Sequence, residues 1–153
     1  MSKVEERLTA AGVTLPQPVA PIANYVPYVR SGSLVYISGQ VSLDAGGGVT
    51  GTVGTEVDLA GAQKAARICG VNLLAQMKAA CEGDLDRVVR VVKLGGFVQA
   101  GPDFFDIPSV INGCSDVMVE AFGPAGRHAR SAVGVYRLPR NFSVEVDAVV
   151  EIA

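Results

Sequence analysis

The sequence predicts an α+β fold in which two helices cover one face of a single β-sheet. Segments rich in β-branched residues and segments with helical periodicity follow one another in the order β-β-α-β-α-β-β. The chain has 153 residues, the usual size of one domain, so residues 1–153 are expected to form a single domain. Hydrophobic residues make up 49% of the chain, which is enough for a core without disulfides or metals.

A polar N-terminal extension, residues 1–23, precedes the first predicted strand. Its first part, 2–11, predicts a short helix because apolar residues recur near helical spacing. The segment 14–24 contains three prolines, which remove backbone donors and favour extended conformations, so we expect a surface linker there. Residues 25–43 then predict two strands separated by a turn at Ser31-Gly32-Ser33.

The middle of the chain predicts a mobile glycine-rich loop at 44–54 and a long helix at 57–80. The loop is not a phosphate-binding loop, because it has neither the GxGxxG pattern nor a Walker lysine. Thr55 is the expected cap of the helix, and Glu82-Gly83-Asp84 ends it. Residues at three- and four-residue steps mark its buried stripe, namely Leu59, Ala62, Ala66, Cys69, Leu73 and Met77.

The C-terminal half predicts one strand at 87–100, a helix at 109–122, and two strands at 130–138 and 142–152. We expect the last two strands to pair with each other around a turn at Pro139-Arg140-Asn141. Alternation of their valines then places Arg130, Glu145 and Asp147 together on the face away from the helices.

In this pairing Arg130 lies roughly 10 Å or more along the strand from Glu145. A compact site containing both residues therefore requires Arg130 to reach along the sheet, or a second subunit to contribute. The uncovered sheet face must itself be polar or buried against another subunit. Both points indicate an oligomer.

Several classes of protein are disfavoured by composition. The net charge is −2 and the basic residues are scattered, which argues against a nucleic-acid partner. The three cysteines, Cys69, Cys81 and Cys114, and the single histidine, His128, lack the spacing of a zinc site. The sequence has no apolar signal core and no run of about 20 apolar residues that could span a membrane. We therefore expect a cytoplasmic protein with reduced thiols and without metal or cofactor.

The segment 129–152, ARSAVGVYRLPRNFSVEVDAVVEI, resembles the signature of the Rid (reactive intermediate deaminase, YjgF) family. In that pattern an Arg-Ser pair opens a strand, Leu-Pro makes a turn, and a V-E-V-[ED]-A strand follows. Further similarity lies in LVYISGQ at 34–40, in Asn72 of the long helix, and in Ile111-Asn112 of the second helix. The resemblance extends from about Tyr25 to the end of the chain and is strongest to a longer subgroup.

The resemblance implies a chorismate-mutase-like fold with a mixed sheet, assembled as a barrel-forming homotrimer with clefts between subunits. It also implies hydrolysis of small enamines and imines, such as 2-aminoacrylate, to 2-keto acids and ammonia. The expected ligand is a small metabolite that bears a carboxylate, and no cofactor is implied.

The resemblance further assigns roles to individual residues. Arg130 is expected to clamp the substrate carboxylate, and Glu145 to position the attacking water. Tyr25, with Tyr28 as a competitor, is expected in the cleft. The remaining substrate-binding residues are Ser38, Gly39, Asn112 and Ala132.

Two departures from the family pattern bear on these roles. Ala132 replaces a common cysteine, so thiol modification is impossible at that position, although a backbone amide near it could help to bind the substrate anion. The segment 95–112 is longer than in the deaminase group and borders the expected cleft.

These roles fit the chemistry of the residues, but each has an alternative. A guanidinium binds a carboxylate through two parallel hydrogen bonds, and a glutamate can accept a proton from water. Arg130 could instead form an interface salt bridge, and Glu145 could be a solvated or interface carboxylate. Tyr25 could be a packing aromatic, and Asn112 could cap the second helix. His128 is expected to be exposed in a loop, where Arg127 adds positive potential.

Two other functions are open for the whole protein. The same cleft could serve a non-catalytic small-carboxylate-binding or regulatory module. The ribonuclease activity attached to the family name is disfavoured, because the chain is near-neutral and lacks a histidine-based acid–base pair.

Overall fold

The computed structural model describes residues 1–18, 20–21 and 23–153. The part of the linker prediction that concerns residues 19 and 22 lies outside them. The strands are β1 (Tyr28–Ser31), β2 (Leu34–Val41), β3 (Val88–Gln99), β4 (Ala129–Val135) and β5 (Val144–Ile152). The helices are α1 (Lys3–Ala10), α2 (Leu59–Ala80) and α3 (Ile107–Phe122), with short 3-10 turns η1 (Leu85–Arg87), η2 (Gly123–Gly126) and η3 (Pro139–Asn141).

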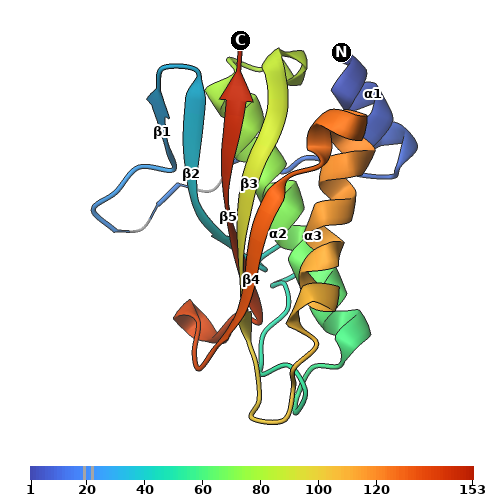
Figure 1. Cartoon of the computed structure of the whole chain (residues 1–153), viewed down its shortest axis with the longest axis vertical. Coiled ribbons are helices and arrows are strands. Elements are labelled where there is room, and N and C mark those ends of the chain that lie inside the picture. The colour runs from blue at the N-terminus through green and yellow to red at the C-terminus, as the bar shows by residue number, and fades with distance from the viewer. Residues whose placement is uncertain (19, 22) are drawn as a thin grey trace.

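The strands form one mixed sheet in the order β1-β2-β5-β3-β4 (Figure 1). Helices α2 and α3 both lie on one side of this sheet, and the short helix α1 lies beside the end of α3 (Figure 1). The predicted α+β architecture with two helices on one face is therefore confirmed. None of the helices within the described ranges is long and apolar enough to cross a membrane.

The position of β4 differs from the prediction. Strand β4 pairs in parallel with β3, while β5 pairs antiparallel with both β2 and β3. The expected hairpin between the last two strands is therefore wrong, because β3 lies between them. The reason is that α3 connects β3 to β4 as a crossover helix, which returns the chain to the same end of the sheet and makes the two strands parallel.

This topology changes the face on which Arg130 lies. Arg130 pairs with Leu94 of β3, and Leu94 pairs with Ala148 of β5. Paired residues point to the same face of a sheet, and Leu94 and Ala148 are buried under the helices, so Arg130 lies on the helix side. Glu145 and Asp147 alternate with the buried residues of β5 and so face the other way. The prediction that all three polar residues share one face is wrong for Arg130, whereas it is correct for the two carboxylates.

Helix α2 begins two residues later than predicted, and its cap is Asp58 instead of Thr55. The side chain of Asp58 accepts a hydrogen bond from the amide of Gly61 at 2.8 Å, as helix caps commonly do. The predicted stripe is buried from Ala62 to Met77. A Cβ added to Gly70 would lie 2.5 Å from Val117 of α3, so glycine here lets the two helices pack closely.

The segment 44–54 forms a loop, as predicted, but backbone hydrogen bonds tie it to the end of the sheet, which differs from the mobile loop that its glycines predicted. Val53 is buried, and its amide donates a hydrogen bond to the carbonyl oxygen of Gln99. The amide of Gly51 donates in the same way to Asn141, in the turn before β5. The loop and this turn therefore hold each other in place.

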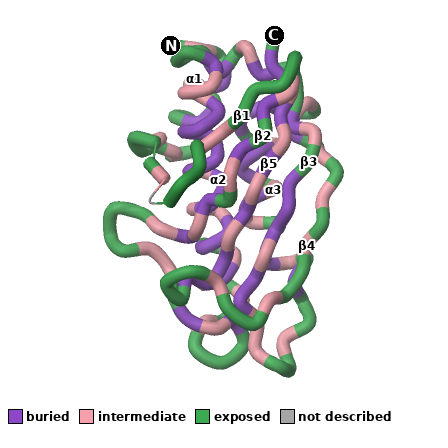
Figure 2. Tube along the Cα trace, turned by 90° about the vertical axis from the view of Figure 1, so that its left-hand side faces the viewer, coloured by how far each residue is buried: buried purple, intermediate pink, exposed green. Residues whose placement is uncertain are grey.

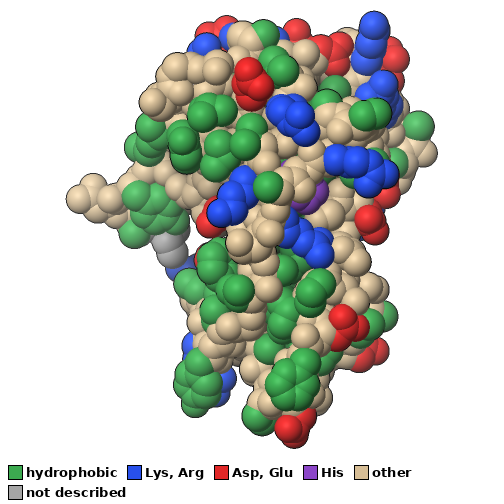
Figure 3. Space-filling view, in the orientation of Figure 1, with side chains coloured by type: hydrophobic (Ala, Val, Ile, Leu, Met, Phe, Trp, Pro, Cys, Tyr) green, Lys and Arg blue, Asp and Glu red, His purple; other side chains and the backbone are tan. Residues whose placement is uncertain are grey.

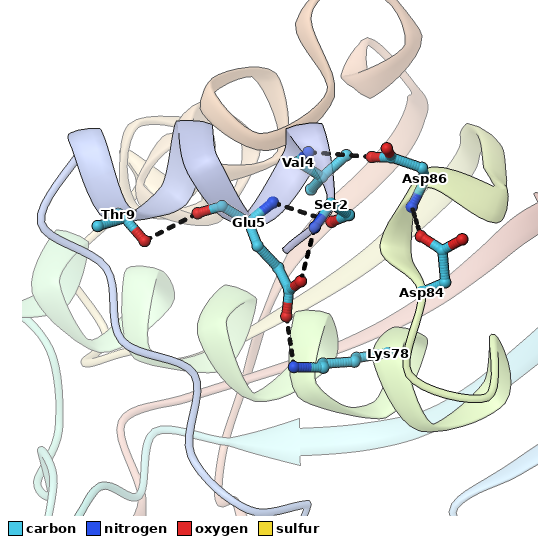
Figure 4. Close-up of polar contacts among 7 residues, drawn as sticks. All are labelled: Ser2, Val4, Glu5, Thr9, Lys78, Asp84 and Asp86. Carbon is cyan, nitrogen blue, oxygen red and sulfur yellow. Dashed lines mark hydrogen bonds and ion pairs between the residues drawn. The ribbon is translucent and has the colours of Figure 1, made fainter.

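Helix α1 forms as predicted and is docked by polar contacts at its N-terminus (Figure 4). Ser2 and Glu5 form a reciprocal capping box. The carboxylate of Asp86 accepts hydrogen bonds from the amides of Lys3 and Val4, each at 3.0 Å. Lys78 of α2 forms an ion pair with Glu5. These contacts attach the N-terminal extension to the end of α2 and to η1.

Candidate functional site

The side chain of Arg130 lies against α3 at the edge of the sheet. Its Nη1 donates hydrogen bonds to Asn112 Oδ1 at 2.8 Å and to Ser115 Oγ at 3.0 Å. Its Nη2 donates to the carbonyl oxygen of Pro108 at 3.2 Å. Because Asn112 lies inside α3, whose N-terminal cap position is Asp106, the alternative that Asn112 caps this helix is wrong.

These bonds leave one edge of the guanidinium available. Of its five N–H donors, three are used, which leaves two: the Nε–H and one Nη2–H. Glu145 and Asp147 lie on the opposite face, and among the described residues no carboxylate forms an ion pair with Arg130. A salt bridge within one chain is therefore not its role. The free edge matches the two oxygens of a carboxylate.

Ser115 connects Arg130 to His128, which is half-buried and not exposed as predicted. His128 Nδ1 lies 2.6 Å from the carbonyl oxygen of Gly126, and its Nε2 lies 2.9 Å from Ser115 Oγ. A carbonyl only accepts, so Nδ1 carries the proton and Nε2 accepts the Ser115 hydroxyl. Burial lowers the pKa of His128; the Gly126 bond opposes this, and the charge of Arg130 adds to it. The imidazole is thus held neutral at physiological pH.

A cavity of about 410 Å³ opens beside this group. Basic side chains gather around the histidine on this face of the molecule (Figure 3). Arg127 shares the cavity with Arg130, as the sequence suggested, and its carbonyl oxygen accepts a hydrogen bond from Arg90. The lining residues are Asn112, Ser115, Asp116, Val119, Arg127, His128 and Arg130. This arrangement favours a small anion.

Glu145 lies in a second cavity, of about 350 Å³, at the other side of the sheet. A Cβ added to Gly39 would lie 2.9 Å from Glu145 Cδ, so only glycine lets the carboxyl group lie against β2. Burial raises the pKa of Glu145, and the negative charge of Asp147 raises it further. Such a carboxylate is a stronger base than an exposed glutamate.

Hydrogen bonds to the backbone shape the wall of the Glu145 cavity. Ser38 Oγ donates to the carbonyl oxygen of Val26 at 2.8 Å, which fixes the segment before β1. Tyr25 lines this cavity and is 52% exposed, whereas its competitor Tyr28 packs against the core. From α2, Asn72 Nδ2 donates to the carbonyl oxygens of Val41, at the end of β2, and of Leu43, just beyond it. The hydroxyl of Ser38 and the amide of Asn72 therefore donate to the backbone that forms the cavity wall.

The structure thus separates the predicted site residues into two groups. Arg130 and Asn112 line the cavity beside α3, while Tyr25, Ser38, Gly39 and Glu145 line the other cavity. Ala132 is partly buried against the core, on the helix side of β4. One chain therefore does not bring the guanidinium and Glu145 together.

No group of three or more His, Cys, Asp or Glu side chains within the described ranges could hold a metal ion. The three cysteines are free thiols and all are buried. Burial raises the pKa of Cys114 to about 12, and that of Cys69 well above its ordinary value. These two thiols are therefore held protonated and are poor nucleophiles.

The chain matches the family model described as "YjgF/chorismate_mutase-like, putative endoribonuclease" over residues 5–151. It is 47% identical over 152 residues to Protein TCP17 of Trypanosoma cruzi, with 98% of this chain and 94% of that protein covered. The crystal structure of Atu1372, a protein of unknown function from Agrobacterium tumefaciens, is similar with a TM-score of 0.92 at 52% identity; 98% and 92% of the chains are covered. A 2-iminobutanoate/2-iminopropanoate deaminase of Dermatophagoides farinae is 34% identical, with 90% of each chain covered.

Proposed function

Because the chain belongs to the YjgF/chorismate mutase-like family, we propose that it hydrolyses small 2-imino acids to 2-keto acids and ammonia. The family match and the similar structures confirm the resemblance seen in the sequence and the chorismate-mutase-like fold. The deaminase from Dermatophagoides farinae supports the proposed reaction.

The observation that carries the proposal is the free edge of Arg130. Three acceptors of α3 fix the guanidinium, and none of the three neutralises its charge. A substrate carboxylate would supply the missing charge and use both remaining N–H donors. Bound in this way, the imine carbon next to the carboxylate is held in one place, which removes much of the entropic barrier to attack by water.

Glu145 is the proposed base. The substrate reacts as its protonated iminium form. As the water oxygen bonds to the iminium carbon, Glu145 takes a proton from that water, and the electron pair of the carbon–nitrogen double bond moves to nitrogen, which becomes a neutral amine. Glu145 then returns the proton to nitrogen; as the carbon–nitrogen bond breaks, ammonia leaves, the hydroxyl proton passes to Glu145, and a keto group remains. The raised pKa of Glu145 suits both steps, since this carboxyl group must first accept a proton and then donate it.

This chemistry needs two copies of the chain, and we propose the homotrimer that the family resemblance implies. Arg130 of one copy would face Glu145 of another, with Tyr25, Ser38 and Gly39 beside the carboxylate. The uncovered sheet face supports such an assembly (Figure 2). It exposes apolar residues near both edges of the sheet: Val29 and Tyr36, paired across β1 and β2, are 53% and 50% exposed, and Val133 on β4 is 45% exposed.

Turnover of imines generated by an amino-acid oxidase tests the proposal. We expect the protein to accelerate release of keto acid and ammonia over buffer, and Arg130→Ala to raise KM at least tenfold by removing the charge-assisted clamp. Glu145→Gln should bind the product keto acid normally and lose at least 90% of kcat, since an amide accepts protons poorly. KM and kcat of the wild type and of both variants are measured by trapping the residual imine with semicarbazide.

The pH profile is the control for the role of Glu145. In the wild type, kcat/KM should fall as the pH drops through the raised pKa of this carboxylate, because only the ionised form is a base. Glu145→Gln should lose this limb. If no imine is hydrolysed faster than in buffer while keto acids still bind to the wild type and not to Arg130→Ala, the protein is a carboxylate-binding module.

The three buried free thiols support a reducing compartment, and we propose that the protein acts in the cytoplasm.

A further inference from the structure

The turn before β5 has an unusual backbone. Arg140 and Asn141 have φ values of 54° and 63°, so two consecutive residues with side chains adopt the left-handed conformation. This conformation is unfavourable for any residue other than glycine, although asparagine tolerates it better than most. Such outliers persist only where the surroundings fix them, and they concentrate at ligand-binding positions.

A buried side chain fixes this turn. Gln99 is fully buried; its Nε2 donates to Asn141 Oδ1 at 2.7 Å, and its Oε1 accepts from the amide of Leu138 at 2.8 Å. The carbonyl oxygen of Asn141 accepts a hydrogen bond from the amide of Gly51 at 2.8 Å. The left-handed pair is therefore held from both sides by the end of β3 and by the glycine-rich loop.

The turn places the guanidinium of Arg140 at the Glu145 cavity. Arg140 lines that cavity together with Tyr25, Ser38 and Glu145. Among the residues the structure describes, none forms a hydrogen bond or an ion pair with its side chain. Its neighbour Arg137, in contrast, stacks on Tyr136 with 4.1 Å between the guanidinium carbon and the ring centroid, and does not line the cavity.

The rest of the cavity is mostly apolar. Its walls come from the segment before β1, the end of β2 and the start of β5, and include Ala20, Pro21, Pro27, Val41, Leu43 and Phe142. An aliphatic chain fits such walls, and a cation at the margin suits an anionic end group. The cavity therefore combines a reactive carboxylate, an apolar surface and a free positive charge.

We infer that Arg140 recognises a second carboxylate, so that the enzyme prefers 2-imino acids with acidic side chains, such as the imine of glutamate. This inference rests on the proposed function. The partner subunit would supply Arg130 for the first carboxylate, and Glu145 would act at the imine carbon. The methylene groups of the substrate would lie along the apolar wall and end at the Arg140 guanidinium.

The test compares the imine of glutamate with the imine of leucine, each generated in situ by an amino-acid oxidase. For the wild type we expect the higher kcat/KM with glutamate imine. Arg140→Gln should lower that value about tenfold or more, as expected for loss of a charge-assisted hydrogen bond, and change the leucine value less than twofold. Arg140→Lys should retain most of the preference, because it keeps the charge.

Two further variants separate recognition from folding of the turn. Arg140→Asn removes the charge but suits the left-handed backbone, so it should lose the preference and keep the wild-type melting temperature. Arg137→Gln removes a charge from the same turn outside the cavity and should leave both substrates unaffected. An equal loss with both imines, or an unchanged preference in Arg140→Asn, would overturn the inference.

A binding measurement keeps the inference independent of turnover. Calorimetric titration with the two product keto acids, 2-oxoglutarate and 2-oxoisocaproate, should show tighter binding of the dicarboxylate, and Arg140→Gln should abolish the difference. If this difference is present but no imine is hydrolysed, the deaminase proposal fails and the specificity of the site stands. If hydrolysis occurs without any such difference, Arg140 has no role in recognition.

Discussion

Arg130 is held by neutral acceptors of α3, and this explains how a positive charge can stay both fixed and available. Asn112 and Ser115 orient one end of the guanidinium through hydrogen bonds of 2.8 and 3.0 Å. A carboxylate in their place would neutralise the charge that the substrate requires. His128 supports this arrangement because its neutral ring accepts the Ser115 hydroxyl, which leaves the serine oxygen free to accept from Arg130.

Replacing Ser115 with alanine should loosen the guanidinium without removing it. We expect KM for the imine to rise about three- to tenfold, which is the effect of one lost hydrogen bond, with kcat reduced less than twofold. Ser115→Thr, which keeps the hydroxyl, should restore KM. Steady-state kinetics that resolve KM from kcat provide the measurement.

A matched control, Ser109, lies six residues earlier in the same helix. Ser109 Oγ donates a hydrogen bond to Asp106 Oδ1 at 2.6 Å and is not among the acceptors of Arg130, so Ser109→Ala should leave KM unchanged. Equal changes in Ser109→Ala and Ser115→Ala would mean that helix stability, and not the position of Arg130, determines KM.

At the residue scale, the sequence could predict the groups that carry charge but not those that position them. The Arg-Ser pair and the V-E-V-D strand directed attention to Arg130 and Glu145 because their spacing has a chemical meaning. Ser115 and His128 are separated by 13 positions, and their contact arises only when α3 packs beside β4. No local pattern in the sequence encodes that packing.

At the element scale, the crossover of α3 decides where the site lies. The long helix, the strand before it and the uncovered sheet face all follow from periodicity in the sequence. The alternation of β4 is equally compatible with a partner on either side, so it could not choose between β5 and β3. That choice transfers Arg130 from the uncovered face to the helix side, and it splits the site in two.

The attachment of helix α1 should depend on pH, because the carboxylates of Glu5 and Asp86 hold the helix against α2 and η1. Hydrogen bonding to Lys78 and Ser2 lowers the pKa of Glu5 from 4.5, and the amides of Lys3 and Val4 lower the pKa of Asp86 from 3.8. A carboxylate with a lowered folded-state pKa stabilises the fold above its unfolded pKa. This contribution is lost as the pH falls through the folded-state pKa, so the attachment of α1 should weaken at acidic pH, below the ordinary pKa values of the two carboxylates.

Hydrogen exchange of the α1 amides, followed between pH 7 and pH 3, tests this expectation. Protection should be constant down to about pH 5 and decrease below pH 4. Asp86→Asn should lower protection severalfold already at pH 7, whereas Asp103→Asn, in an exposed loop, should not. Equal protection of α1 in the wild type at pH 7 and pH 3 would show that apolar packing of Val4 and Leu8 alone holds the helix.

At the scale of the whole molecule, the layers of the fold were predictable from the sequence, whereas the position of β4 and the make-up of the site were not. Binary patterning predicted a covered and an uncovered sheet face, and the exposed Tyr36 and Val133 confirm that apolar side chains remain on the uncovered one. The relation of Arg130 to Glu145 depends on a second copy, whose position a pattern of residues does not specify.

The separation of Arg130 and Glu145 on opposite faces allows a decisive test by mixing two impaired variants. Arg130→Ala and Glu145→Gln subunits, unfolded and refolded together, should form assemblies in which some clefts receive an intact arginine from one copy and an intact glutamate from another. For a homotrimer with equal mixing, one cleft in four contains both groups, so at substrate concentrations well below KM we expect activity near one quarter of the wild type. Each variant refolded alone should keep at most about a tenth of the activity of refolded wild type under the same conditions. If the mixture is no more active than the two variants alone while the assemblies form, no cleft combines Arg130 and Glu145 of different copies, and Arg140, the guanidinium that already shares a cavity with Glu145, becomes the candidate clamp.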